Sequence, residues 1–163
     1  MNTDHILSTL NKHEVAYMLI GGMNFLLRHA PVLTYDVDVW IDDEPANRER
    51  CETALSELQA EWGPSDNDWV PVAARKPGWL ETQALYCLIS PYGAIDVFRS
   101  VKGLESWTTC RDRAQSERTP AGTAYLGLSD ADMLRCQLVL DRGQQKPERI
   151  RVLSKALGEP GDE

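Results

Sequence analysis

The sequence lacks a long hydrophobic run and any closely spaced pair of cysteines. No apolar stretch approaches the roughly 18 residues that span a bilayer, so no membrane helix is expected. The N-terminal residues have the pattern of a polar helix rather than that of a signal peptide. Four cysteines are scattered along the chain: Cys51, Cys87, Cys110 and Cys136. This usage favours reduced thiols and a cytoplasmic protein.

Histidine and positive charge are also scarce. The three histidines, His5, His13 and His29, do not have the spacing of a zinc site. The net charge is −8, and its acidic excess lies within residues 1–100, because residues 101–163 carry ten acids and ten bases. This distribution argues against a surface coated with basic charge for gripping nucleic acid, although a local basic groove is compatible with it.

What remains is the composition of an ordinary globular domain. The chain has 163 residues, of which 42% are hydrophobic, and a chain of this length can bury roughly 70% of its unfolded surface without a disulfide or structural metal. We expect one domain over residues 1–163. Within it, a sheet-containing core is expected over 1–127 and a C-terminal helical pair over 128–157.

Hydrophobic periodicity predicts the main elements. Helices are expected from Thr3, which would serve as a cap, from Pro45, over residues 130–141, and from Pro147. Strands are expected over residues 15–20 and 34–42, and a hairpin over 84–98. The helix over 130–141 should direct Met133, Leu134 and Leu138 inward. Residues 62–83 are expected to be strand and loop, and residues 103–127 to be irregular.

The stretch "TYDVDVWID" places two aspartates in a strand that is otherwise apolar. Side chains alternate along a strand, so Asp36 and Asp38 share one face while Val37, Val39 and Ile41 share the other. A third aspartate, Asp96, interrupts the later strand "AIDVF" in the same way. Repelling carboxylates become useful when divalent cations lie between them, because magnesium prefers oxygen ligands. The alternative is an exposed edge strand without function.

A glycine pair, Gly21-Gly22, separates the strand "VAYMLI" from the apolar helix "MNFLLRHA". Glycine lets a ligand approach the backbone closely, and a helix N-terminus offers free N–H groups to an anion. The order along the chain is therefore a candidate phosphate cradle, a pair of candidate metal ligands and a third carboxylate. A glycine pair after a strand is by itself more often a simple turn.

These motifs together resemble the nucleotidyltransferase superfamily, whose fold is shared with DNA polymerase beta. "LIGGMNFLLRHAPVLTYDVDVWI" resembles its opening signature, and "AIDVF" resembles its third acidic strand. The segment "LSDADMLRCQLVLDRGQQKPERIRVLSKAL" is similar to the two-helix tail of AbiEii-type toxin nucleotidyltransferases. The resemblance covers about residues 14–41, 84–99 and 126–157. It implies an α+β fold with a small mixed β-sheet, helices on one side and a helical C-terminal segment.

The resemblance also implies roles for particular residues. Asp36, Asp38 and Asp96 would be the catalytic metal ligands for Mg²⁺ or Mn²⁺, and Asp96 would also help to orient or activate the nucleophile. The residues implied in nucleotide binding are Gly21, Gly22, Asn24, Thr34, Arg135 and Lys146. Asn24 is included as the polar side chain nearest to Gly22, where many relatives have serine. Arg142, Lys146 and Arg149 recur at helical spacing and could form a basic face toward the cleft, or simply a solvated surface.

Two functions follow from these observations. The first is an enzyme that moves a nucleoside monophosphate from an NTP to an RNA (tRNA) or protein acceptor, as a toxin with a cognate antitoxin would; a small-molecule acceptor is the weaker option. The second is a non-catalytic module that binds nucleotide or a partner. Three departures from the family pattern motivate the second: Gly22 in place of serine, Val32 in place of arginine, and Pro147 in place of the aspartate after the lysine.

Overall fold

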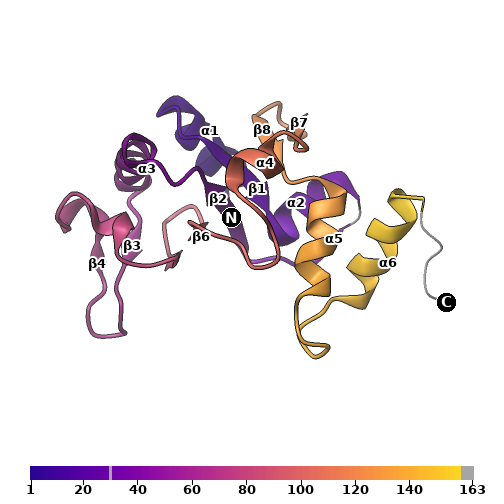
Figure 1. Ribbon diagram of the computed structural model, residues 1–163. Helices are drawn as coiled ribbons and strands as arrows, with labels where there is room; N and C mark the ends of the chain where they lie inside the picture. Colours follow the sequence, from indigo (N-terminus) through magenta and orange to yellow (C-terminus); the bar gives the residue numbers. More distant parts are fainter. Residues whose placement is uncertain (30, 159–163) are drawn as a thin grey trace.

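A six-stranded mixed sheet with strand order β5-β6-β2-β1-β8-β7 forms the centre of the molecule (Figure 1). The computed structural model describes residues 1–29 and 31–158. The strands of the main sheet are β1 (Tyr17–Ile20), β2 (Asp36–Ile41), β5 (Leu85–Leu88), β6 (Ala94–Phe98), β7 (Gln115–Arg118) and β8 (Ala124–Gly127). The short strands β3 (Glu61–Trp62) and β4 (Val70–Pro71) pair separately, followed by the 3₁₀ turns η1 (Val72–Ala74) and η2 (Trp79–Glu81).

Strand directions determine which side chains become neighbours. β2 is antiparallel to β1 and parallel to β6, and β8 is parallel to β1. The register places Asp38 beside Ile20 on one side and beside Asp96 on the other. Because paired residues point to the same face, the aspartates of β2 and β6 share one face of the sheet.

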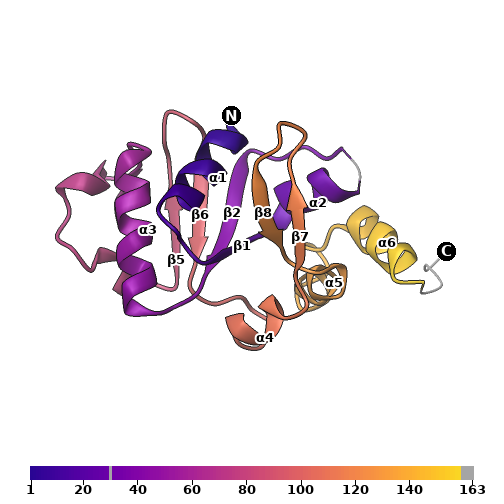
Figure 2. The ribbon, with the colours of Figure 1, turned by 90° about the horizontal axis from the view of Figure 1, so that it is seen from above.

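One face of the sheet is covered by α1 (Thr3–Lys12) and α3 (Pro45–Glu57), toward which Figure 2 looks. The apolar stripes of both helices are completely buried there: Ile6, Leu7, Leu10, Cys51, Ala54 and Leu55. The N-cap of α1 is Asn2 and not Thr3 as predicted, since Asn2 Oδ1 accepts a hydrogen bond from the His5 N–H at 3.0 Å. Asparagine is among the preferred N-cap residues, and the helix starts one residue earlier for that reason.

The opposite face is covered by α4 (Trp107–Arg111) and by the C-terminal helices α5 (Asp130–Leu138) and α6 (Pro147–Ala156). Met133 and Leu153 pack there against Met18 and Trp40 of the sheet. The predicted fold class is thereby confirmed: a mixed sheet, helices on one side and a helical C-terminal segment, which packs on the other side. In the described residues, no helix has the length and apolar character needed to cross a membrane.

Two predictions about elements were wrong. Met133 and Leu134 point inward as predicted, but Leu138 is 57% exposed, because the next turn of α5 directs Cys136 and Gln137 toward the cavity instead. Residues 103–127 are not irregular, since they form α4 and the antiparallel hairpin β7–β8. Strand β7 is the outer strand of the sheet and largely exposed, so its sequence "QSER" shows no hydrophobic alternation.

Candidate active site

Three carboxylates converge on the face of the sheet that carries α5 and α6. Asp36 and Asp38 come from β2, and Asp96 comes from the adjacent parallel strand β6. One carboxylate oxygen from each residue lies within 4.8 Å of the others. The close approach follows from strand geometry, because the pleat aligns alternate residues of β2 with the paired residue of β6.

Burial and mutual repulsion make this cluster unfavourable for negative charge. The pKa of Asp38 is raised from 3.8 to about 8 by burial and by the charges of Asp36 and Asp96. The pKa of Asp96 is raised to about 6, again by burial first and then by Asp36. Asp38 Oδ1 is buried and has no hydrogen-bond partner among the described residues. A buried carboxylate oxygen without a donor fits a divalent cation, which prefers hard oxygen ligands.

Gly21 joins this cluster to the start of α2 (Gly21–Arg28). Its φ is +70°, and a Cβ at this position would lie 2.2 Å from Asp38 Oδ2. Any side chain would therefore collide with a candidate metal ligand, in a backbone conformation that already favours glycine. Helix α2 has no side-chain cap, so the N–H groups of its first turn are available to an anion beside the carboxylates.

Gly22 lies close to the side chains of Thr34 and Arg149. A Cβ on Gly22 would be 3.0 Å from Thr34 Oγ1 and 3.1 Å from Arg149 Nη2. Thr34 Oγ1 donates a hydrogen bond to the Asp36 carbonyl at 3.3 Å, which links this loop to β2. The Arg149 guanidinium lies 5.7 Å from the Phe25 ring centroid and has no ion pair among the described residues. An unpaired guanidinium at the start of a helix suits a phosphate group.

A cavity of about 260 Å³ opens beside the cluster, between α2, the end of β6, α5 and α6. Asp38 and Gly21 form one end of it, and Lys102, Gln137 and Arg149 supply its other polar groups. The remaining lining is apolar: Ile20, Phe25, Phe98, Val101, Leu128, Met133, Cys136, Val139, Leu140 and Leu153. Apolar walls with a few convergent polar groups are typical of small-ligand sites.

The structure brings together six of the sequence-predicted site residues and separates three. Gly21, Gly22, Thr34 and the three aspartates surround one site. Asn24 is completely buried, and its Nδ2 donates a hydrogen bond to the Leu128 carbonyl at 3.0 Å, away from the carboxylates. Arg135 pairs with Glu105 at 2.6 Å. Lys146 is exposed at the N-cap of α6 and does not line the cavity. Nucleotide binding by these three residues stays a prediction.

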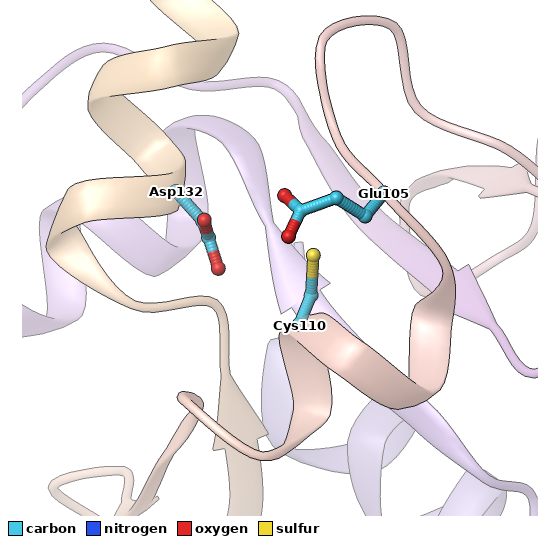
Figure 3. Close-up of side chains that lie close together, drawn as sticks. All are labelled: Glu105, Cys110 and Asp132. Carbon is cyan, nitrogen blue, oxygen red and sulfur yellow. The ribbon is translucent and has the colours of Figure 1, made fainter.

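A second acidic cluster lies between α4 and α5 and consists of Glu105, Cys110 and Asp132 (Figure 3). Its charges are already neutralised. Arg113 donates hydrogen bonds to both oxygens of Asp132, at 3.0 and 3.1 Å, and to both oxygens of Glu105, and Arg135 adds a further pair with Glu105. A guanidinium occupies the place that a metal ion would need, so this cluster stabilises the packing of α4 against α5.

Sequence reasoning missed two polar residues of the cavity, Lys102 and Gln137, and it named a third, Arg149, only as part of a possible basic face. Its helical spacing with Arg142 and Lys146 in the family-like tail was the sequence feature that pointed to Arg149. Lys102 lies in a segment without a recognisable motif. Gln137 lies in the family-like tail, but no sequence pattern marked it as a site residue. Arg28, which lies four residues before Val32, donates hydrogen bonds to the Leu128 carbonyl and to Asp130.

Comparison with protein-family models and with curated proteins finds no match to the sequence. Solved structures do match. A candidate nucleotidyltransferase from Thermotoga maritima aligns over 95% of this chain and 89% of its own, with TM-score 0.54 and 19% identity. ANT(2")-Ia in complex with adenylyl-2"-tobramycin aligns over 94% and 86%, with TM-score 0.58 and 14% identity. The lincosamide antibiotic adenylyltransferase LnuA with lincomycin bound aligns over 91% and 92%, with TM-score 0.53 and 14% identity. The chain therefore has the nucleotidyltransferase fold.

Proposed function

We propose that this protein is a metal-dependent nucleotidyltransferase, which moves a nucleoside monophosphate from an NTP to a hydroxyl acceptor. One observation carries the proposal: three carboxylates within 4.8 Å of one another lie directly against a glycine that tolerates no side chain. In the nucleotidyltransferase fold, this pairing provides a phosphate cradle beside a metal-ligand cluster. Fold alone would not support an activity, because one fold can carry many functions.

Each part of the site has a defined task in this reaction. Asp36, Asp38 and Asp96 would hold Mg²⁺ or Mn²⁺. When bound, the cation neutralises charge on the transferring phosphate and on the leaving pyrophosphate. The bond between the α-phosphorus and the bridging oxygen breaks as the acceptor oxygen bonds to phosphorus, and Asp96 at the rim accepts the hydroxyl proton.

The other residues would position the nucleotide. The backbone at Gly21-Gly22 and the guanidinium of Arg149 would bind the β- and γ-phosphates, because both lie at the start of α2. The nucleoside would occupy the cavity between α5 and α6, whose apolar walls suit a base and exclude water. Lys102 and Gln137 are the side chains available to bind its polar edge.

Three classes of hydroxyl acceptor follow from the resemblance and from the structural matches. The resemblance to AbiEii-type toxins favours a tRNA end or a protein hydroxyl, and with it a toxin neutralised by a cognate antitoxin. Two of the structural matches contain a small antibiotic or its adenylylated form. A hydroxyl on a small molecule is therefore the third acceptor class.

A non-catalytic binding module is the second candidate. It is supported by the absence of a cation at Val32 and by Arg28, which is bonded to Leu128 and Asp130 and turned away from the cradle. Such a module would bind an NTP without releasing pyrophosphate. The buried, unpartnered oxygen of Asp38 favours the enzyme, since it is costly unless a cation binds there.

The test is label transfer from each of the four α-labelled NTPs, with magnesium, to tRNA, to total protein and to hydroxyl-bearing small molecules. Asp36→Asn/Asp38→Asn should abolish transfer, whereas Asp66→Asn, an exposed carboxylate in the loop between β3 and β4, should leave it unchanged. Magnesium-dependent NTP binding without transfer would favour the binding module. Equal transfer by both variants would contradict the proposed site.

A further inference from the structure

An apolar surface lies next to the metal-ligand cluster on strand β5. Cys87 is paired with Asp96, so the two side chains share one face of the sheet. Leu85 lies two residues before Cys87 in β5. Ile89 lies two residues after it, directly beyond the end of β5, where it continues the extended chain by an antiparallel bridge to Glu61. Both side chains therefore point to the same face as Cys87. All three are exposed, Leu85 by 40% and Ile89 by 49%, whereas the intervening residues are buried on the other face. Leu85, Cys87 and Ile89 are called the β5 shelf below.

The β5 shelf lies on the side from which an acceptor must approach. The strand order is β5-β6-β2-β1, and Gly21 directly follows β1. The phosphate cradle and the β5 shelf are thus on opposite sides of the three carboxylates. In an in-line displacement the acceptor oxygen attacks opposite the leaving pyrophosphate. With pyrophosphate held at Gly21-Gly22, the attacking hydroxyl comes from the direction of Asp96 and the shelf.

The two described strand segments that form this side of the site carry no cationic side chain. Residues 31–41 and 85–98, which contain the three aspartates and the shelf, include no lysine, arginine or histidine. The cations near the site, Arg149 and Lys102, line the nucleotide cavity instead. Nucleic-acid binding depends on Lys and Arg contacts to phosphates, and these two segments offer a polyanion none beside the three carboxylates and the cation that they would hold. An uncharged or cationic acceptor meets no such penalty.

The size of the shelf suits a small molecule. From Leu85 to Ile89 it extends about 13 Å along one strand, at about 3.3 Å per residue. A stable protein interface covers about 800 Å² on each partner, which three side chains cannot supply. A hydroxyl compound with one apolar face could cover the shelf and still direct its hydroxyl toward Asp96.

We propose that the β5 shelf binds the apolar face of a small, uncharged or cationic hydroxyl compound, and that this compound, rather than nucleic acid, is the acceptor. The inference rests on the proposed function. The acceptor oxygen forms the new bond to the α-phosphorus, pyrophosphate leaves toward Gly21-Gly22, and the hydroxyl proton passes to Asp96. The shelf contributes affinity and orientation, and it takes no part in the chemistry.

The test uses two probes with the same sugar, phenyl β-D-glucoside and methyl β-D-glucoside, and compares their binding to the full chain by saturation-transfer NMR with magnesium present. The phenyl compound should bind about tenfold more tightly, a factor that corresponds to about 1.4 kcal/mol and that partial burial of a phenyl group can supply. Leu85→Ser/Ile89→Ser should remove this preference. Val70→Ser, a change at a residue of similar exposure on β4, should retain it.

Three outcomes would overturn the inference: equal binding of the two glucosides, an unchanged preference in Leu85→Ser/Ile89→Ser, or label transfer from NTP to tRNA. Transfer to the phenyl glucoside that is lost in the double variant and kept in Val70→Ser would support it. If no acceptor receives label while the binding preference behaves as expected, the proposed function is contradicted and the shelf is retained as a binding surface. The binding measurement therefore tests the β5 shelf, and the transfer measurement tests the proposed function, independently of each other.

Discussion

Two acidic clusters in the described part of the chain differ in what neutralises their charge. Asp36, Asp38 and Asp96 lie together without a guanidinium among them, and Asp38 Oδ1 is buried without a donor. Asp132, which is completely buried, is instead bonded through both oxygens to Arg113. A buried carboxylate is stabilised by a fixed positive charge, and one without such a partner shifts its pKa or binds an added cation.

The difference separates a structural role from a functional one more clearly than the residue types do. Both clusters combine three potential metal ligands at similar distances. In the cluster of Figure 3, Arg113 and Arg135 reach the carboxylates from α4–β7 and α5, so its charge is balanced within the fold. In the cluster on the sheet, no side chain balances the repulsion among Asp36, Asp38 and Asp96, and a bound cation would relieve it. Four experiments test this difference between the two clusters.

The largest effect is expected from Gly21→Ala. The added Cβ would lie 2.2 Å from Asp38 Oδ2 at a φ of +70°, so the backbone is strained and the carboxylate displaced. Nucleotide transfer should fall at least about 100-fold, because a misplacement of about 1 Å has that cost. Gly122→Ala is the matched control: its φ is +96° and no atom lies within 4 Å, so it should lose about 1 kcal/mol of stability and no activity. Similar activity in both variants would contradict the close approach.

Removing the charge of Asp132 should destabilise the fold without affecting the reaction. Asp132→Asn leaves Arg113 without its buried partner and should lower the free energy of unfolding by about 2 kcal/mol, less than for a fully buried pair because Arg113 is 35% exposed. Urea unfolding measures the change. Glu105→Gln, at the exposed end of the same network, should change the free energy of unfolding much less, because solvent screens an exposed ion pair. Equal losses would mean that burial of Asp132 is not the decisive feature.

Arg149 is the guanidinium nearest to the unneutralised cluster, and its removal should weaken NTP binding. Arg149→Met should raise the KM for NTP about 10- to 30-fold, the value of a lost hydrogen bond to a charged group. Lys146→Met should have a smaller effect, because Lys146 does not line the cavity. Arg151→Met serves as the control, since Arg151 pairs with Glu148 on the exposed side of α6. The opposite order for Arg149 and Lys146 would favour the assignment made from sequence.

The smallest effect concerns pH. Asp38 and Asp96 have pKa values raised to about 8 and about 6, so the folded chain binds their protons more tightly than the unfolded chain does. In chelator, stability should therefore fall as pH rises from about 4 through 8. Asp38→Asn should unfold at a higher temperature than the unsubstituted chain at pH 8, by about 2–4 °C for a gain on the order of 1 kcal/mol, and by less at pH 5. A constant difference across this range would show that Asp38 is ionised throughout.

Sequence patterns predicted the central part of the fold and much of the site. Strand β2 could be predicted because Val37, Val39 and Ile41 alternate with polar residues, and this alternation also placed Asp36 and Asp38 on one face. Hairpin β7–β8 could not be predicted, because exposed outer strands need no apolar alternation. The domain boundary near residue 127 remains a prediction, as do the toxin role, the antitoxin and the cytoplasmic location.

Local chemistry, visible in the sequence alone, determined the strand with its paired aspartates and the glycine pair that follows β1 at the start of α2. These features depend on residues close together in the chain, and the spacing of such residues determines which side chains share a face of a strand or helix. Only the tertiary structure decided that Arg149 and not Lys146 meets Gly22, and that Arg113 neutralises Asp132. Each of these contacts joins elements far apart in sequence, and their positions depend on packing, for which sequence spacing carries no signal.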